Sequence, residues 1–319
     1  MIRYTAGFLF ALAAFGFIFL HTQINMKKEI QPVEISIPSG MTISEIGKIL
    51  EKNRVIKSRF LFVLYSKIRG GFPKSGYYRF EGNLSIKDVW EKLYRGEERL
   101  FRFTIIPGDD LIDIGEKLEK KGFLSKKTFY SYVFNKENVE KFGLKGSSFE
   151  GYFPPETYYL RKDADIQQII KSFLKIFNKR YQPVLKNTNG LSDYEIMIIA
   201  SLVEKETSVP EEKPIIAGII IKRLKKGMKL QIDPTVIYAL KLQGKWYGKL
   251  EKKDMKVDSP YNTYLKSGLP PTPISSFSLQ TLKSVINYKE TDFLYFFSKD
   301  GKRHIFSRSY KEHLKNIKK

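Results

Sequence analysis

Two stretches of the chain repeat one pattern of apolar and polar positions, at an offset of 68 residues (from 40 to 108). One begins at Gly40 and the other at Gly108, and each follows a β-like run that contains a proline, 33–38 or 101–107. Apolar residues then recur at the spacing of one helix face, as Ile43, Ile46 and Leu50 and as Leu111, Ile114 and Leu118. Each copy therefore predicts a strand, a turn at glycine and an amphipathic helix.

Later segments predict further helices. Residues 84–93 repeat the helical part of the pattern, with Ser85 as the expected N-cap. The segment from Leu191 to Thr207 has a capping box, Ser192 with Glu195, before a run that is apolar nearly all round, so we expect it in a core. Other predicted elements are a loop at 187–190, helices at 213–225, 234–242 and 279–287, a hairpin of 293–298 and 303–307 around Asp300 and Gly301, and a basic tail helix.

The N-terminus is strongly apolar. Residues 4–26 carry no formal charge apart from that of a protonated His21. As a helix these 23 residues would span about 34 Å, which exceeds a hydrocarbon core of about 30 Å. The alternative is a cleaved signal peptide, but no Ala-x-Ala type site follows Leu20. We therefore expect a retained transmembrane anchor in the cytoplasmic membrane, with the folded chain on the outer side.

These elements predict an α+β protein in three parts. Residues 1–28 form a short cytoplasmic N-terminus and the transmembrane anchor, residues 29–125 form a small α/β region containing the two repeats, and residues 126–319 form a larger α+β domain. The repeats are consistent with two ordinary αβ units that arose by duplication. A role for them in binding a wall polymer is the competing interpretation.

The net charge of the chain limits the classes of molecule that it is expected to bind. Fifty-six Lys and Arg against 34 Asp and Glu give a net charge of +22, which favours nucleic acid, lipid head groups or acidic wall polymers. The basic residues are scattered and no nucleic-acid-binding motif occurs, so we expect no nucleic-acid partner. The chain has no cysteine, and its three histidines lack an HExxH spacing. We therefore expect neither a metal nor another cofactor.

Glu204 is the unusual residue of the apolar helix. It lies four positions after Ala200 and eight after Ile196, on the stripe that these residues occupy. Desolvation there favours the protonated carboxyl, which is the form that a general acid needs near neutral pH. The alternative is that Glu204 marks the helix end and pairs with Lys205 or Lys222.

An acid of this kind suits the cleavage of a glycosidic bond, because protonation of the bridging oxygen lets the bond break. A hydrolase normally needs a second carboxylate, and Asp233, Glu150 and Glu156 are the candidates. Glu206 cannot share the face of Glu204, since two residues rotate about 200° around a helix. A lytic transglycosylase avoids the requirement, because the C6 hydroxyl of muramic acid attacks C1 within the same sugar.

Several ordered motifs of the chain carry a resemblance to known proteins. They are 200–207 (ASLVEKET), 230–238 (LQIDPTVIY), 261–264 (YNTY), 268–271 (GLPP), 150–158 and 295–307. Together they resemble the motifs of one enzyme family, the MltG (YceG-like) endolytic murein transglycosylases. The resemblance covers almost the whole chain, including an N-terminal region similar to LysM repeats, and departs from the usual residues at Pro154, Glu156 and Thr272.

The resemblance implies a single-pass inner-membrane lyase that cleaves the MurNAc-GlcNAc β-1,4 bond of nascent peptidoglycan strands and leaves 1,6-anhydroMurNAc ends. It implies that residues 126–319 are the catalytic domain, that Glu204 is the catalytic residue, and that peptidoglycan synthases are partners. Candidate substrate contacts are Thr207, Gln231, Asp233, Tyr261, Asn262 and Tyr264.

Three alternatives remain open at this stage. Asp233 before Pro234 is equally suited to be the N-cap of a helix. The LysM-like region either binds glycan or holds the catalytic domain at a set height above the membrane. A non-catalytic peptidoglycan-binding scaffold of the cell-wall synthesis machinery is the alternative function.

Overall fold

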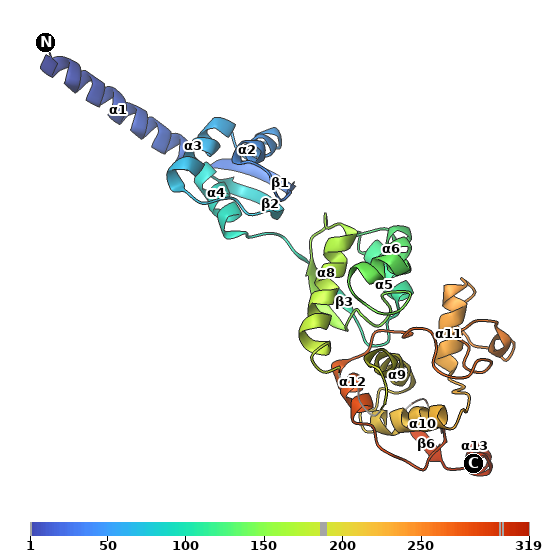
Figure 1. Ribbon diagram of the computed structural model, residues 1–319. Coiled ribbons are helices and arrows are strands. Elements are labelled where there is room, and N and C mark those ends of the chain that lie inside the picture. The colour runs from blue at the N-terminus through green and yellow to red at the C-terminus, as the bar shows by residue number, and fades with distance from the viewer. Residues whose placement is uncertain (1, 186–189, 300, 302, 319) are drawn as a thin grey trace. The chain divides into compact units, whose positions relative to one another are not determined.

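The computed structural model describes residues 2–185, 190–299, 301 and 303–318 (Figure 1). The chain divides into two compact units, Met1–Phe101 with Arg161–Asp163 and Arg102–Leu160 with Ala164–Lys319. The described residues form helices and three two-stranded sheets, so the predicted α+β class is confirmed. Residues 187–189 of the predicted loop and Asp300 of the predicted turn lie outside the described residues.

The first unit begins with α1 (Ile2–Asn25). Its described residues also form one two-stranded sheet and three short helices. Strands β1 and β2 pair antiparallel, with a register shift between Ile30 and Val33. The capping boxes of α2 and α4 begin these helices, as the sequence predicts for Ser85 of α4. The elements are β1 (Lys28–Ile37), α2 (Ile43–Lys52), α3 (Arg59–Arg69), β2 (Gly76–Leu84) and α4 (Ile86–Arg95).

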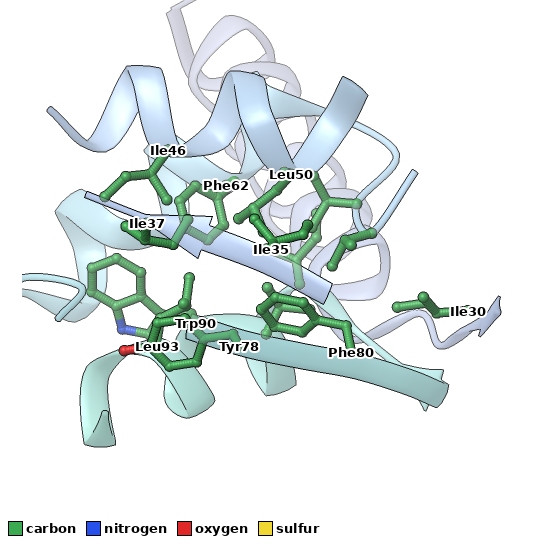
Figure 2. Packing of buried hydrophobic residues seen from close by; sticks show 14 residues of the cluster. Ile30, Ile35, Ile37, Ile46, Leu50, Phe62, Tyr78, Phe80, Trp90 and Leu93 are labelled. Carbon is green, nitrogen blue, oxygen red and sulfur yellow. The ribbon is translucent and has the colours of Figure 1, made fainter. Parts of the chain in front are cut away.

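The core of this unit lies between the sheet and its helices (Figure 2). Alternate residues of both strands point into it, including Ile35 from β1 and Tyr78 from β2. Trp90 of α4 meets Phe62 of α3 edge to face, with ring centroids 5.7 Å apart. The apolar face that the sequence predicts for residues 43–50 is the face of α2 that is buried in this core.

The segment predicted to be a membrane anchor is helical as α1. Among the residues that the structure describes, no helix combines the length and the apolar character needed to cross a membrane.

The second unit opens with the second copy of the repeat. Strand β3 pairs with β4, which lies some fifty residues further on, and α5 packs against α6. Residues 102–125 therefore belong with the second unit, whereas the sequence grouped them with the first repeat. The elements are β3 (Phe101–Ile105), α5 (Leu111–Lys120), α6 (Lys126–Val133), α7 (Lys136–Lys141), β4 (Glu156–Leu160), α8 (Ile166–Ile176) and a π-helical turn, η1 (Phe177–Tyr181).

The remaining elements agree with the predicted helices and hairpin. Helix α9 lies at the centre of this half and packs against α10, α11 and α12 (Figure 1). Strands β5 and β6 pair antiparallel, as the sequence predicts. The elements are α9 (Asp193–Glu206), α10 (Lys213–Lys225), α11 (Asp233–Leu242), a 3₁₀ turn η2 (Asp254–Lys256), α12 (Leu279–Ile286), β5 (Tyr295–Ser298), β6 (His304–Ser307) and α13 (Tyr310–Ile317).

Candidate active site

Helix α9 carries the candidate acid at its C-terminal end. Ser192 caps the helix in a reciprocal capping box with Glu195, and the apolar run 196–203 is buried on every side. This explains why the helix forms and why it occupies the middle of the unit. It ends at Thr207, whose backbone is extended (φ −141°, ψ 139°).

The last turn of α9 holds three charged residues in a row, 204–206. Successive helical residues are rotated by about 100°, so the three side chains leave the helix in three directions. Lys205 points toward the loop between β3 and α5, where its ammonium group donates to the carbonyl of Gly108 at 3.0 Å. The two carboxyl groups on either side of it therefore lie in different surroundings.

Glu204 is enclosed by hydrogen-bond donors. Its Oε1 lies 3.0 Å from the ammonium nitrogen of Lys213, and both side chains are only 6% exposed. Its Oε2 accepts from the backbone N–H of Ser278 at 2.8 Å, from the hydroxyl of Ser278 at 3.0 Å and from the hydroxyl of Thr281. These contacts fasten α9 to α10 and to the start of α12, and they occupy both carboxyl oxygens.

These surroundings differ from those expected for the acid. The sequence predicts a protonated Glu204 in a partly dry groove, whereas the structure buries its carboxyl group against an ammonium group. The alternative expectation was right about an ion pair and wrong about the partner. Lys205 binds Gly108, and Lys222 donates to the carbonyl of Thr291 at 2.8 Å.

Glu206 lies on the other side of α9 in a contrasting environment. Its side chain is partly buried and has no hydrogen-bond or ion-pair partner among the described residues. Burial, together with the negative charge of Asp233, raises the pKa of Glu206 to about 8. Glu206 is therefore a protonated carboxylic acid at neutral pH, and its proton is not committed to another group of the described chain.

The start of α11 brings one predicted substrate residue, Asp233, near Glu206. Gln231 and Asp233 are exposed on either side of the buried Ile232, and Gln231 has a positive φ of 55°. That conformation is strained for a residue with a side chain, and Thr263 holds it by accepting from the N–H of Gln231 at 3.1 Å. The hydroxyl of Tyr264 donates to Asp233 Oδ1 at 2.5 Å.

Asp233 does not cap α11, as one prediction had it. The N-cap position is Ile232, and Asp233 is the first helical residue, before Pro234. Its side chain makes no cap and instead accepts the hydrogen bond from Tyr264. Burial, with that hydrogen bond to Asp233, raises the pKa of Tyr264, so this phenol stays a donor.

Asn262 supports the loop from inside. It is fully buried, and its amide donates to the carbonyls of Met255 at 3.0 Å and Val257 at 2.8 Å. Its Oδ1 accepts from the N–H of Tyr264 at 3.0 Å. Asn262 therefore positions Tyr264, and its own amide is not accessible to a substrate.

Tyr261 and Thr207 also make internal contacts. The hydroxyl of Tyr261 lies 3.0 Å from that of Thr272. Thr207 is 4% exposed, donates to Glu212 at 2.9 Å and accepts from the N–H of Val209 at 3.0 Å. Of the predicted substrate residues, the structure brings Asp233 and Tyr264 near Glu206, leaves Gln231 exposed in the turn before α11, and uses Thr207, Tyr261 and Asn262 to stabilise the surrounding chain.

Two other predicted partner carboxylates are engaged elsewhere. Glu150 is fully buried, and its Oε2 accepts from the hydroxyl of Tyr238 at 2.8 Å and from the N–H of Leu111 at 3.1 Å. Burial, with the charge of a neighbouring aspartate, raises the pKa of Glu150 to about 8. Glu156 pairs with Arg180 at 2.5 Å. Asp233 is the predicted partner that lies near a candidate acid.

The described ranges contain no group of three or more His, Asp or Glu side chains that could hold a metal ion. A protonated acid beside a second, exposed carboxyl group is suited to protonating a leaving oxygen while a positive charge develops nearby.

The chain is similar to proteins of one family. The model of the YceG-like family matches residues 35–319. A Bacillus subtilis protein named endolytic murein transglycosylase is 34% identical over 89% of this chain and 83% of its own length. A Streptococcus pneumoniae protein of the same name is 32% identical over 89% of this chain and 58% of its own length. The crystal structure of a yceG-like protein from Listeria monocytogenes, 29% identical, aligns with 91% of this chain and 100% of its own, with a TM-score of 0.60.

Proposed function

The chain belongs to the YceG-like family, and from this premise we propose that it is an endolytic peptidoglycan lytic transglycosylase with Glu206 as its acid. Its substrate would be the MurNAc-GlcNAc β-1,4 bond of glycan strands, and its products would carry 1,6-anhydroMurNAc ends. The observation that supports this best is the unpaired, partly buried carboxyl of Glu206, with a pKa raised to about 8 beside Asp233.

In the proposed reaction, Glu206 donates its proton to the bridging oxygen, which leaves as the 4-hydroxyl of GlcNAc. Positive charge develops on C1 and the ring oxygen of MurNAc, and the carboxylate of Asp233 stabilises it. The C6 hydroxyl of the same MurNAc attacks C1 and returns its proton to the Glu206 carboxylate. The enzyme is regenerated and no water is consumed.

Asp233 also gives a reason to test hydrolysis as a second candidate. An exposed carboxylate near a protonated one is the pair that an inverting or retaining glycosidase uses. Mass spectrometry of the products from purified glycan strands separates the reactions, because an anhydro end is lighter than a hydrolysed end by one water. We expect anhydro ends, and exclusively hydrolysed ends would reject the transglycosylase.

A non-catalytic scaffold is the remaining alternative. It would bind isolated sacculi without creating any glycan ends, so the same experiment addresses it. Sacculus binding with no new ends of either kind, by protein that is folded, would favour the scaffold.

The pH dependence of cleavage follows from Glu206. Its pKa is raised, so the acid form is present below about pH 8 and is lost as the pH rises through that value. We expect kcat/KM, which reports the protonation state of the free enzyme, to fall about tenfold for each pH unit above 8. The measurement is the initial rate of release of anhydro ends between pH 5 and 10, with folding followed by circular dichroism at each pH. A rate that stays constant to pH 10 would contradict this assignment.

We further propose that α1 anchors the chain in the cytoplasmic membrane and that cleavage occurs on nascent strands beside peptidoglycan synthases. The apolar run 7–20 and the net charge of +22 support a position at an anionic membrane surface. We expect the chain to remain in the membrane fraction after a high-salt wash and to be released by detergent. Release from the membrane by salt alone would contradict the proposed anchor. When the protein is added to a reconstituted synthase, we expect the glycan strands to become shorter. Strands of unchanged length would contradict the proposed action on nascent strands.

A further inference from the structure

Three buried side chains connect the end of the catalytic helix to the C-terminal hairpin. The hydroxyl of Thr207, the residue after Glu206, donates to Glu212 Oε2 at 2.9 Å. The Nδ1 of His304 lies 2.8 Å from the same oxygen, and the backbone N–H of His304 donates to Glu212 Oε1 at 2.9 Å. The Glu212 and His304 side chains are only 7% and 8% exposed.

We propose that Glu212 and His304 are positioning residues for cleavage, which hold Thr207 at the end of α9 and thereby fix the direction of the Glu206 carboxyl group. This inference rests on the proposed function, in which Glu206 is the acid. Neither Glu212 nor His304 contacts the substrate in it. Both act through Thr207.

The charge states suit this arrangement. Burial raises the pKa of Glu212, but the hydrogen bonds from the backbone and ring of His304 and from Thr207 outweigh it, and the pKa lies below its usual value. An ionised carboxylate only accepts hydrogen bonds, so the ring of His304 donates from Nδ1. Such charge-assisted hydrogen bonds are shorter and stronger than neutral ones, particularly between groups this deeply buried.

The position of Thr207 links this arrangement to the acid. Adjacent Cα atoms are about 3.8 Å apart, so a change in the backbone of Thr207 moves Glu206 directly. The N–H of Thr207 closes the last turn of α9 on the carbonyl of Val203 at 3.2 Å, and its hydroxyl accepts from the N–H of Val209. Without the hydroxyl, the last turn has fewer partners and is expected to fray.

The C-terminal hairpin supports Thr207 and Glu212 through His304. His304 is the first residue of β6 and pairs with Ser298 of β5. Its ring packs edge-on against Phe296, with centroids 5.4 Å apart, and lies beside Phe306. These two ring contacts limit the rotamers that the His304 side chain can adopt. The hairpin therefore contributes to the active site from about 100 residues further along the chain.

The test compares variants of the full-length chain. Thr207→Val removes the hydroxyl but keeps the shape of the side chain, and we expect kcat for release of new glycan ends to fall about 10- to 100-fold with an unchanged KM. Thr207→Ser keeps the hydroxyl and should retain most of the activity. His304→Ala should reproduce the loss, and the Thr207→Val/His304→Ala double variant should be no slower than the slower single variant, because the three groups act as one unit.

The matched control is His313→Ala. His313 packs on Tyr295 and Phe297 in the same C-terminal region, with centroids 5.4 and 5.5 Å apart, but does not contact Glu212. It should leave kcat unchanged. Three results would each overturn the inference. They are full activity in folded Thr207→Val, a double variant whose loss of kcat is the product of the two single losses, and an equal loss of kcat in His313→Ala. Failure of the proposed function is distinct, because it appears as full activity in Glu206→Gln.

Discussion

Replacing Glu206 with glutamine is expected to reduce cleavage of purified glycan strands by about 10³-fold. Glutamine keeps the size and most of the polarity of the side chain but has no acidic proton to give to the bridging oxygen. The raised pKa of Glu206, about 8, indicates that the wild-type carboxyl holds that proton at neutral pH. The measurement is the release of new glycan ends, counted by mass spectrometry, from protein whose folding is checked by circular dichroism.

Glu204→Gln is the informative comparison, because it makes the same chemical change two residues earlier in the same helix. The carboxyl of Glu204 is already bound to Lys213, Ser278 and Thr281, so we expect the folded fraction of this variant to keep most of its activity. An inactive but folded Glu204→Gln together with an active Glu206→Gln would return the role of acid to Glu204.

The contrast between these two glutamates marks the limit of what the sequence could predict here. The capping box, the apolar run and the end of α9 all follow from local patterns, and each agrees with the structure. A helix that is apolar nearly all round, however, has no single buried face. Spacing therefore could not tell which carboxyl meets Lys213 and which faces Asp233, since tertiary packing decides this.

The domain boundary and the supporting residues were also hard to predict, because both depend on contacts between residues that are far apart in the sequence. The repeat at Gly108 resembles the one at Gly40, but its strand pairs with residues 156–160, and no local pattern indicates that partner. The motifs predict Thr207 and Asn262 as substrate contacts. Their hydrogen bonds assign them to supporting the chain, and His304 could be linked to Glu212 only once the hairpin was placed.

The ion pair of Glu204 carries the largest expected effect on stability. Lys213→Met should lower the free energy of unfolding of the second unit by about 3–5 kcal/mol, because it leaves a buried carboxylate without its counter-charge. Both side chains are 6% exposed, so water cannot replace the lost ammonium group. The measurement is urea unfolding, monitored through the hydrogen exchange of the amides in α9 and α10.

Two variants show whether an unpaired charge is the cause. The double variant Glu204→Gln/Lys213→Met removes both charges, and we expect it to recover most of the loss, since a buried pair can be replaced by neutral groups at little cost. Lys222→Met changes another lysine of α10, whose side chain is 29% exposed and lies 3.5 Å from the exposed Asp292, and should cost about 1 kcal/mol or less. If Lys213→Met were as mild as Lys222→Met, the pair would not hold α9 in place. The stability data would then give no support to a structural role for Glu204, in contrast to the role of Glu206 as the acid.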